Sequence, residues 1–438
     1  MKNKRINHSH KFFPVWKKVF LGLAIILSGI IAACGDDDPI KKPEVEVPTQ
    51  TRRSLYSRNQ LKKSGVEVPT QTLLMYMPWS TNLTSFFMIN IADMEEAIAE
   101  GILKHERVLV FLATSPTKAS MFELLYDAAN GTCVRQTLKE YDNHPCTTVE
   151  GIAGILTDMK TFAPATIYSM TIGGHGLGWL PVQTATNASE AKASSTPSTA
   201  PTYHWEVPGE YLTRYFGGTT ANHQTDITTL AKAIESVGIT MEYILFDDCY
   251  MSNVEVAYDL RHVTRHFIAS TCEVMAYGMP YHPMAKHLLG DINYDSISQT
   301  FYNFYIDYSM PCGTIATTVT SELDSLATLM REINTHHTWD SQLDKQVQRL
   351  DGYSPSLFYD LGDYVSHLCT DSLLLTRFNE QLERAVPITS RAYTPTYYSM
   401  YTGRQARINR FCGLTISDPS THHLATPKAE TNWYKATH

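Results

Sequence analysis

The chain has 438 residues, of which 44 are acidic and 36 basic, so its formal net charge is −8. This balance excludes the broad positive field that proteins use to hold nucleic acid, and we expect no nucleic-acid partner. Hydrophobic residues make up 43% of the chain and charged residues 18%, which is typical of an ordinary globular protein.

Residues 1–33 are typical of an export signal. A basic start is followed by an apolar run over residues 19–33, which ends in small residues and is shorter than the roughly 20 residues that span a bilayer. Residues 31–34, Ile-Ala-Ala-Cys, resemble a bacterial lipobox in which Cys34 is lipidated after cleavage. An uncleaved membrane anchor is the alternative.

The segment after Cys34 is predicted to be a tether over residues 34–71. Its acidic residues 36–38 resemble a signal for the cell surface, and their alternative role is to solvate the tether. The sequence Val-Glu-Val-Pro-Thr-Gln-Thr occurs at 45–51 and again at 66–72. Two copies do not make a solenoid, so we interpret them as a duplicated flexible linker. We therefore expect an exported lipoprotein in the outer membrane, exposed at the cell surface and held by the lipid on Cys34.

The rest of the chain alternates between two hydrophobic periods. Apolar and β-branched runs predict strands at residues 72–77, 107–113, 166–172, 241–247, 266–270 and 314–320. Helical spacing predicts helices at 88–98, 147–161, 227–237, 252–261 and 323–333, the second with Thr147 as its cap. Asn130-Gly131 predicts a hairpin, and residues 412–417 a last strand. This alternation predicts an α/β fold with a mostly parallel sheet covered on both faces.

Two motifs lie just past the carboxyl ends of predicted strands, where open α/β sheets place reactive side chains. Gly-Gly-His175-Gly follows the strand at 166–172, and Asp-Asp-Cys249 follows the strand at 241–247. A histidine beside a thiol lowers the pKa of the thiol or takes its proton, which makes the sulfur a nucleophile. The backbone N–H groups of Gly176 and Cys249 are candidate donors to an oxyanion. The alternative is a buried structural thiol and a histidine in a turn.

Five segments together resemble the clostripain family of cysteine peptidases, which shares a structural clan with caspases, legumains and gingipains. They are Gly-His-Gly-Leu-Gly-Trp at 174–179, Asp-Asp-Cys-Tyr-Met at 247–251, Glu-Val-Ala-Tyr-Asp-Leu at 255–260, Phe-Ile-Ala-Ser at 267–270 and Gly-Met-Pro-Tyr at 278–281. The resemblance extends over nearly all of the chain after the first seventy residues.

The resemblance implies a caspase-like α/β/α sandwich. Its peptidase core would span residues 72–320, and residues 321–438 would form a carboxyl-terminal extension of helices and a strand packed on it. The implied activity is that of a cysteine endopeptidase, in which Cys249 forms a thioester with a protein or peptide substrate and His175 is acid and base. A catalytically silent cell-surface binding protein on the same fold is the alternative, and acyl transfer is a third reading.

The same family pattern suggests which residues form the substrate pocket: Asp247, Ser270, Glu273 and Tyr277. Tyr277 stands where trypsin-like members carry an aspartate, which argues against cleavage after Arg or Lys. Asp247 could line the pocket or be a structural acid. Asp248 would raise the thiol pKa if its carboxylate lay close to the sulfur. Strand alternation, however, directs neighbouring side chains to opposite sides.

Residues 184–202, between the two candidate catalytic residues, are rich in Ala, Ser, Thr and Pro, which predicts an exposed loop. In clostripain relatives, cleavage after a basic residue in this interval converts a zymogen into a two-part enzyme. Lys192 is the only basic residue of the run and is therefore the candidate processing site. A solvated insertion without a role is the alternative.

The eight cysteines are too few for a disulfide scaffold at this length. Disulfide pairing among those other than Cys34 and Cys249 is left open. The chain has no Cys-x-x-Cys motif, and we expect no metal site and no cofactor. The sequence leaves open a need for calcium, and also the oligomeric state.

Overall fold

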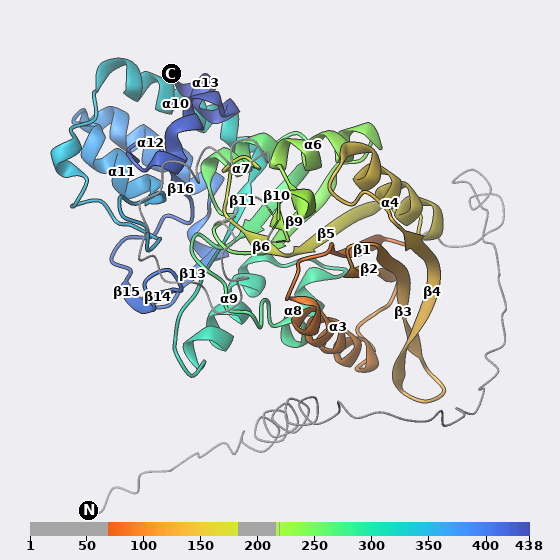
Figure 1. Ribbon diagram of the computed structural model, residues 1–438. Helices are drawn as coiled ribbons and strands as arrows, with labels where there is room; N and C mark the ends of the chain where they lie inside the picture. Colours follow the sequence, from red (N-terminus) through yellow and green to blue (C-terminus); the bar gives the residue numbers. More distant parts are fainter. Residues whose placement is uncertain (1–68, 183–215, 219) are drawn as a thin grey trace, which may run out of the picture. The chain divides into compact units, whose positions relative to one another are not determined.

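The computed structural model describes residues 69–182, 216–218 and 220–438. The predicted export signal, Cys34, the predicted tether up to residue 68 and the predicted loop at 184–202 with Lys192 lie outside these residues. The described residues form a nine-stranded sheet in the order β13-β11-β10-β9-β5-β1-β2-β3-β4 (Figure 1). Its strands are β1 (Gln71–Met77), β2 (Glu106–Ser115), β3 (Lys118–Asp127), β4 (Thr132–Asp142), β5 (Ile167–Gly173), β9 (Met241–Asp247), β10 (Thr264–Ala269), β11 (Thr314–Val319) and β13 (Arg391–Tyr393).

The centre of the sheet is parallel and its edges are antiparallel. Neighbouring strands from β10 through β9, β5 and β1 to β2 pair in parallel. The β10–β11, β11–β13, β2–β3 and β3–β4 pairs are antiparallel. All six predicted strands are confirmed, with ends shifted by a few residues, and so is the predicted hairpin, where Gly131 has φ +63° between β3 and β4. The α/β fold with a largely parallel core is confirmed.

Side chains of the central strands alternate between two hydrophobic cores, one on each face of the sheet. In β1, Leu73, Met75 and Met77 belong to one core, and Leu74 and Tyr76 to the other. Every residue of β1 is buried. A strand covered on both faces needs this continuous apolar sequence, because neither side meets water.

Two layers of helices cover these faces (Figure 1). One layer contains α3 (Thr84–Ala99), α8 (Tyr281–Leu288) and α9 (Tyr294–Ile306), and the other contains α4 (Val149–Phe162), α6 (Ile227–Ser236) and α7 (Val254–Leu260). The helices predicted in these regions are confirmed, although α3 begins earlier than expected. The prediction that Thr147 caps α4 is wrong. The cap is the next residue, Thr148, whose side chain accepts a hydrogen bond from the Gly151 N–H.

The last third of the chain adds helices and also completes the sheet. Its helices are α10 (Leu323–His336), α11 (Leu361–Leu368), α12 (Ser372–Ala385) and α13 (Asn432–Thr437). The strand β13 pairs with β11 at one edge of the main sheet. The strand β16 (Thr415–Ile416), within the predicted last strand, pairs instead with β12 (Tyr359–Asp360) in a separate small sheet. Residues 321–438 thus contribute one strand, β13, to the main sheet, in addition to the helices that pack beside it.

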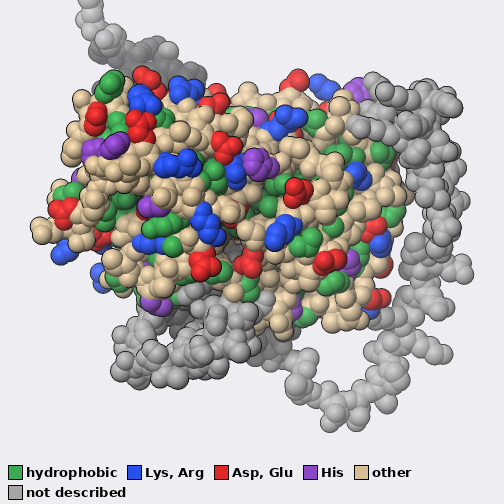
Figure 2. Space-filling view, turned by 90° about the horizontal axis from the view of Figure 1, so that it is seen from above, with side chains coloured by type: hydrophobic (Ala, Val, Ile, Leu, Met, Phe, Trp, Pro, Cys, Tyr) green, Lys and Arg blue, Asp and Glu red, His purple; other side chains and the backbone are tan. Residues whose placement is uncertain are grey.

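One face of the described residues carries charges of both signs. On the face shown in Figure 2, basic and acidic side chains are interspersed rather than gathered by sign. Within the described part of the chain, no helix combines the length and the apolar character needed to cross a membrane.

Candidate active site

The candidate site lies at the carboxyl ends of β5 and β9, which are neighbours in the sheet. Their parallel register sets Gly173 opposite Asp247. His175 and Cys249 each lie two residues beyond this pair, so the topology alone brings the two loops side by side. Both side chains line one small pocket, whose remaining walls come from α3 and from the loop after β10. The structure thus brings together the two residues that the sequence singled out.

A short sheet of its own holds His175 in place. The strand β6 (His175–Gly176) pairs with β7 (Phe216–Gly217), which pairs in turn with β8 (Gln224–Thr225). The ring nitrogen Nε2 of His175 lies 2.9 Å from Oδ1 of Asn82, in the loop between β1 and α3. Burial lowers the pKa of His175 to about 4, so the ring is neutral at physiological pH. Sequence reasoning missed Asn82.

The backbones of the two loops meet closely at Gly176. A Cβ at this position would lie 2.4 Å from the carbonyl oxygen of Cys249 and 3.1 Å from its nitrogen. Only glycine permits such an approach without displacing the cysteine. The two candidate oxyanion donors, the N–H groups of Gly176 and Cys249, therefore belong to backbone segments in direct contact.

The Cys249 thiol is partly exposed and contacts the loop after β10. The Val274 N–H donates to Sγ at 3.3 Å. Burial raises the pKa of the Cys249 thiol well above its usual value, and the negative charges of Glu273 and Asp248 raise it further. Because the thiol pKa is raised and the His175 pKa is lowered, both the thiol and the imidazole are neutral at physiological pH.

The residue after Cys249 has an unusual backbone conformation. Tyr250 has φ +59°, a left-handed conformation that is uncommon for a side chain of this size.

Two adjacent carboxylates line the same pocket. Asp247 accepts a hydrogen bond of 2.9 Å from the Met279 N–H, and burial raises its pKa to about 7. Neither buried oxygen of Asp248 has a hydrogen-bond partner within 3.5 Å among the described residues. Burial, and then the charge of Asp247, raise the Asp248 pKa well above its usual value, while the nearby Gly174 N–H lowers it. At neutral pH the two carboxylates share at least one proton, because two buried like charges repel each other.

The other three residues predicted for the substrate pocket are not among the residues that line it. Ser270 is buried, and its hydroxyl donates to the Cys272 carbonyl. Glu273 accepts from the Met400 N–H and reaches the thiol only through its charge. The hydroxyl of Tyr277 donates to Asp93 at 2.6 Å. The residues on either side of Tyr277, rather than Tyr277 itself, face the pocket.

A segment from the end of the chain supports both loops. The Trp179 side chain, just past His175, donates to Ser417 Oγ at 2.8 Å. Past Cys249, Asn253 donates to Thr415 Oγ1 at 2.7 Å and accepts from the Trp179 N–H at 3.1 Å. Ser252 donates to the Gly413 carbonyl at 2.7 Å. We call residues 413–417 the tail clamp. Its hydrogen bonds connect the segment that follows His175 to the segment that follows Cys249.

The seven cysteines among the described residues are free thiols, so the open question of disulfide pairing is answered for them. In the same residues, no group of three or more His, Cys, Asp or Glu side chains could hold a metal ion.

Known structures resemble this chain closely. A secreted C11 cysteine protease from Bacteroides thetaiotaomicron, "iotapain", is 52% identical with a TM-score of 0.76, over 85% of this chain and 100% of that one. A clostripain from the same species, in complex with the peptide inhibitor BTN-VLTK-AOMK, is 59% identical with a TM-score of 0.50, over 51% of this chain and 99% of that one.

More distant comparisons agree on the fold. An inactive zymogen C11 protease from Parabacteroides distasonis is 24% identical with a TM-score of 0.68, over 85% of this chain and 98% of that one, and shows a shared fold.

No curated protein matches the chain. The clostripain family model matches residues 205–392. Together with the identity to iotapain over its full length, this match shows that the chain belongs to the clostripain family of cysteine proteases.

Proposed function

We propose that this cysteine peptidase hydrolyses peptide bonds through a dyad of Cys249 and His175. The observation that carries the proposal is that both side chains line one pocket at the ends of neighbouring strands. His175 takes the thiol proton, and the sulfur attacks the peptide carbonyl. The imidazolium then protonates the leaving amine, which leaves a thioester. Water, deprotonated by His175, hydrolyses the thioester, and the proton returns to the sulfur.

The neutral state of the pair determines how the first step proceeds. The thiol pKa is raised and the imidazole pKa is lowered, so neither group is charged before substrate binds. Proton transfer to His175 therefore accompanies formation of the carbon–sulfur bond. The N–H groups of Gly176 and Cys249 are proposed to donate to the oxyanion, where hydrogen bonds strengthen as charge develops.

The proposed preference is for lysine or arginine before the cut bond. Asp247 and Asp248 line the pocket beside the thiol, and Asp248 lacks a hydrogen-bond partner among the described residues. A cationic side chain would supply that partner and allow both carboxylates to ionise. The inhibitor bound to the related clostripain has a peptide part that ends in lysine. Tyr277, which argued against this preference, donates to Asp93 instead of lining the pocket.

The dyad is tested with Cys249→Ala and His175→Ala and a peptide library that varies the residue before the cut. We expect each variant to lose at least about 10³-fold in kcat. Cys133→Ala is a matched control, because Cys133 is a partly exposed thiol on β4, outside the pocket. Wild-type protein that cleaves no library peptide, with Cys249 no more reactive to iodoacetamide than Cys133, would support the silent binding protein instead.

We further propose that the protein is exported and lipidated on Cys34, and that it reaches the outer face of the outer membrane. The lipobox-like sequence and the acidic residues after it support this. Membrane fractionation of cells that produce wild type or Cys34→Ala tests the anchor, and protease treatment of intact cells tests exposure. An equal membrane fraction for both forms would contradict lipid anchoring.

Self-cleavage after Lys192 is proposed as the maturation step. The proposal rests on the basic residue within a low-complexity run between the two dyad residues, and on the acidic pocket. Wild-type protein should split into two chains on incubation, whereas Lys192→Ala and Cys249→Ala should stay intact. Cleavage of Cys249→Ala in pure preparations would show that another protease makes the cut.

A further inference from the structure

The loop between β1 and α3 carries a contact that the dyad does not explain. Oδ1 of Asn82 lies 2.9 Å from Nε2 of His175, although the two residues are 93 positions apart in the sequence. An amide oxygen can only accept a hydrogen bond, so the proton between the two atoms belongs to the histidine. This contact therefore selects one tautomer of the ring, in which Nε2 carries the hydrogen and Nδ1 carries none.

That tautomer is the one a thiol needs from its base. With Nε2 protonated, Nδ1 accepts the proton from Cys249, and the resulting imidazolium keeps its Nε2–H on Asn82. The contact also resists rotation of the ring, whose residue lines the same pocket as Cys249. Asn82 itself neither gains nor loses a proton in any step, because its amide is not basic.

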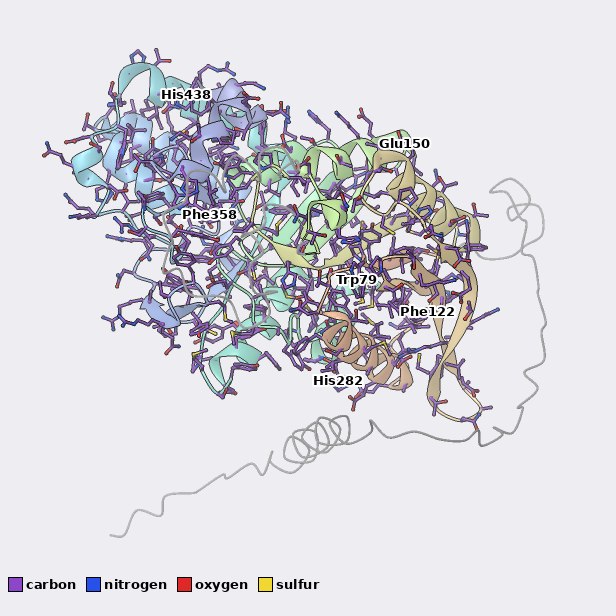
Figure 3. All side chains as sticks on the ribbon, in the orientation of Figure 1. Trp79, Phe122, Glu150, His282, Phe358 and His438 are labelled. Carbon is purple, nitrogen blue, oxygen red and sulfur yellow. The ribbon has the colours of Figure 1, made fainter. Side chains whose placement is uncertain are left out.

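The loop has features of a fixed support. Thr81 has φ +59°, an uncommon conformation for a β-branched residue. The Asn82 N–H donates to the Ser80 carbonyl at 2.7 Å, and the buried Ser80 hydroxyl donates to the Pro78 carbonyl at 3.0 Å. Trp79, labelled in Figure 3, lies in this loop, before α3 begins.

The same loop packs against the strand that pairs with the histidine strand. Gly218 directly follows β7, and a Cβ at Gly218 would lie 2.9 Å from the Trp79 carbonyl oxygen and 3.3 Å from Thr81 Oγ1. Gly217 of β7 in turn pairs with His175. The backbone of His175 and the side chain that orients its ring are therefore held by one contiguous set of contacts.

We propose that Asn82 is the positioning residue for His175, completing a Cys–His–Asn arrangement in which the amide holds the imidazole in the tautomer that accepts the thiol proton. This inference rests on the proposed function, since it assigns Asn82 a role only through a catalytic histidine. It predicts a loss in turnover rather than in substrate binding, because Asn82 acts on the ring and not on the peptide.

The test compares Asn82→Ala and Asn82→Asp in steady-state cleavage of a lysine peptide. Misplacement of a catalytic group costs up to about 100-fold, so Asn82→Ala should lower kcat by about that factor with KM within about twofold of wild type. A carboxylate also accepts the Nε2–H, so Asn82→Asp should recover most of the lost kcat. The rate at which iodoacetamide alkylates Cys249 should follow the same order. Asn379→Ala, an exposed asparagine on α12, is the matched control.

Each other outcome identifies a different error. A higher KM with unchanged kcat would place Asn82 in substrate binding, and wild-type kinetics for Asn82→Ala would remove its role; either result overturns the inference. Equal losses for the Ala and Asp variants would also overturn it, because the acceptor would not matter. Asn82→Leu, which keeps the volume without an acceptor, replaces Asn82→Ala if that variant unfolds. Should His175→Ala keep full activity, the dyad itself fails. If His175→Ala keeps a measurable residual rate, adding Asn82→Ala should lower kcat no further, and a further loss would mean that Asn82 does not act through His175.

Discussion

Two pairs of carboxylates differ in their surroundings. Asp247 and Asp248 border the pocket beside the thiol, whereas Glu255 lies on α7 and Asp418 follows β16. One member of each pair, Asp248 and Glu255, is buried, and the other is partly exposed. Burial raises the pKa of Asp247 to about 7, of Glu255 to about 8 and of Asp418 to about 7. The charge of Lys428 partly compensates the second pair, whereas no Lys or Arg is among the described residues that line the pocket. The proposed cationic ligand would do for the pocket pair what Lys428 does for the other pair.

Among changes to these carboxylates and to Tyr277, the largest effect should come from Asp248→Asn. Removing a buried charge that pairs with a ligand cation costs about 2–5 kcal/mol, so kcat/KM for a lysine peptide should fall by about 100-fold. A peptide with norleucine in place of lysine should lose far less. Glu255→Gln is the matched control and should leave both values unchanged. Equal losses for the two peptides would mean that Asp248 supports the thiol rather than the cation.

Glu255→Gln should instead change the free energy of unfolding relative to wild type, and the change should grow with pH. The folded-state pKa of Glu255 is raised to about 8 by burial and by Asp418, so the proton contributes stability that is fully present below the unfolded pKa of about 4.3. That stability is lost as pH rises through about 8.

The uncharged glutamine removes this loss. Urea unfolding should show that the stability of Glu255→Gln relative to wild type rises by about 3–4 kcal/mol between pH 5 and pH 8. The exposed Glu235→Gln should show no such difference. A stability difference that does not rise with pH would contradict the raised pKa of Glu255.

The pocket pair should appear in a pH profile of selectivity. Raising pH through about 7 ionises Asp247, and the extra charge favours a cationic side chain. The ratio of kcat/KM for lysine over norleucine peptides should therefore rise by about tenfold between pH 6 and 8. Taking this ratio cancels the titration of Cys249 and His175, which both peptides share. A flat ratio would mean that Asp247 keeps its charge state when substrate binds.

Tyr277→Phe should have the smallest effect. The change removes only the hydrogen bond from the Tyr277 hydroxyl to Asp93, worth about 1 kcal/mol of unfolding free energy. Because Tyr277 does not line the pocket, kcat/KM for lysine peptides should stay within about twofold of wild type. A change in the preferred residue before the cut would place this ring in the substrate pocket after all.

The sequence predicted those parts of the site that depend on local patterns. His175 and Cys249 follow apolar strands, and the parallel pairing of β5 and β9 then brings them together. Asn82 carries no such signal: an asparagine ahead of a helix is common in loops, and its partner lies 93 residues away. Tyr277 was assigned to the pocket by its position in a motif, but its side chain turns to α3, where Asp93 accepts its hydrogen bond.

The edges of the fold show the same limit. The central strands could be predicted because a strand that is buried on both faces needs a continuous apolar sequence, as in β1. The three residues of β13 are too few for a periodic pattern, and two of them are only partly buried. The predicted strand at 412–417 contains β16, but its partner β12 could not be inferred, because pairing between distant segments leaves no trace in one sequence.

The tail clamp has a consequence for biosynthesis. Ribosomes add residues from the amino end, so Thr415 and Ser417 emerge long after both loops that they hold. A nascent chain thus exposes its thiol before Trp179 and Asn253 have their hydrogen-bonding partners. These hydrogen bonds can therefore form only after residues 413–417 have been translated, more than 160 residues after Cys249.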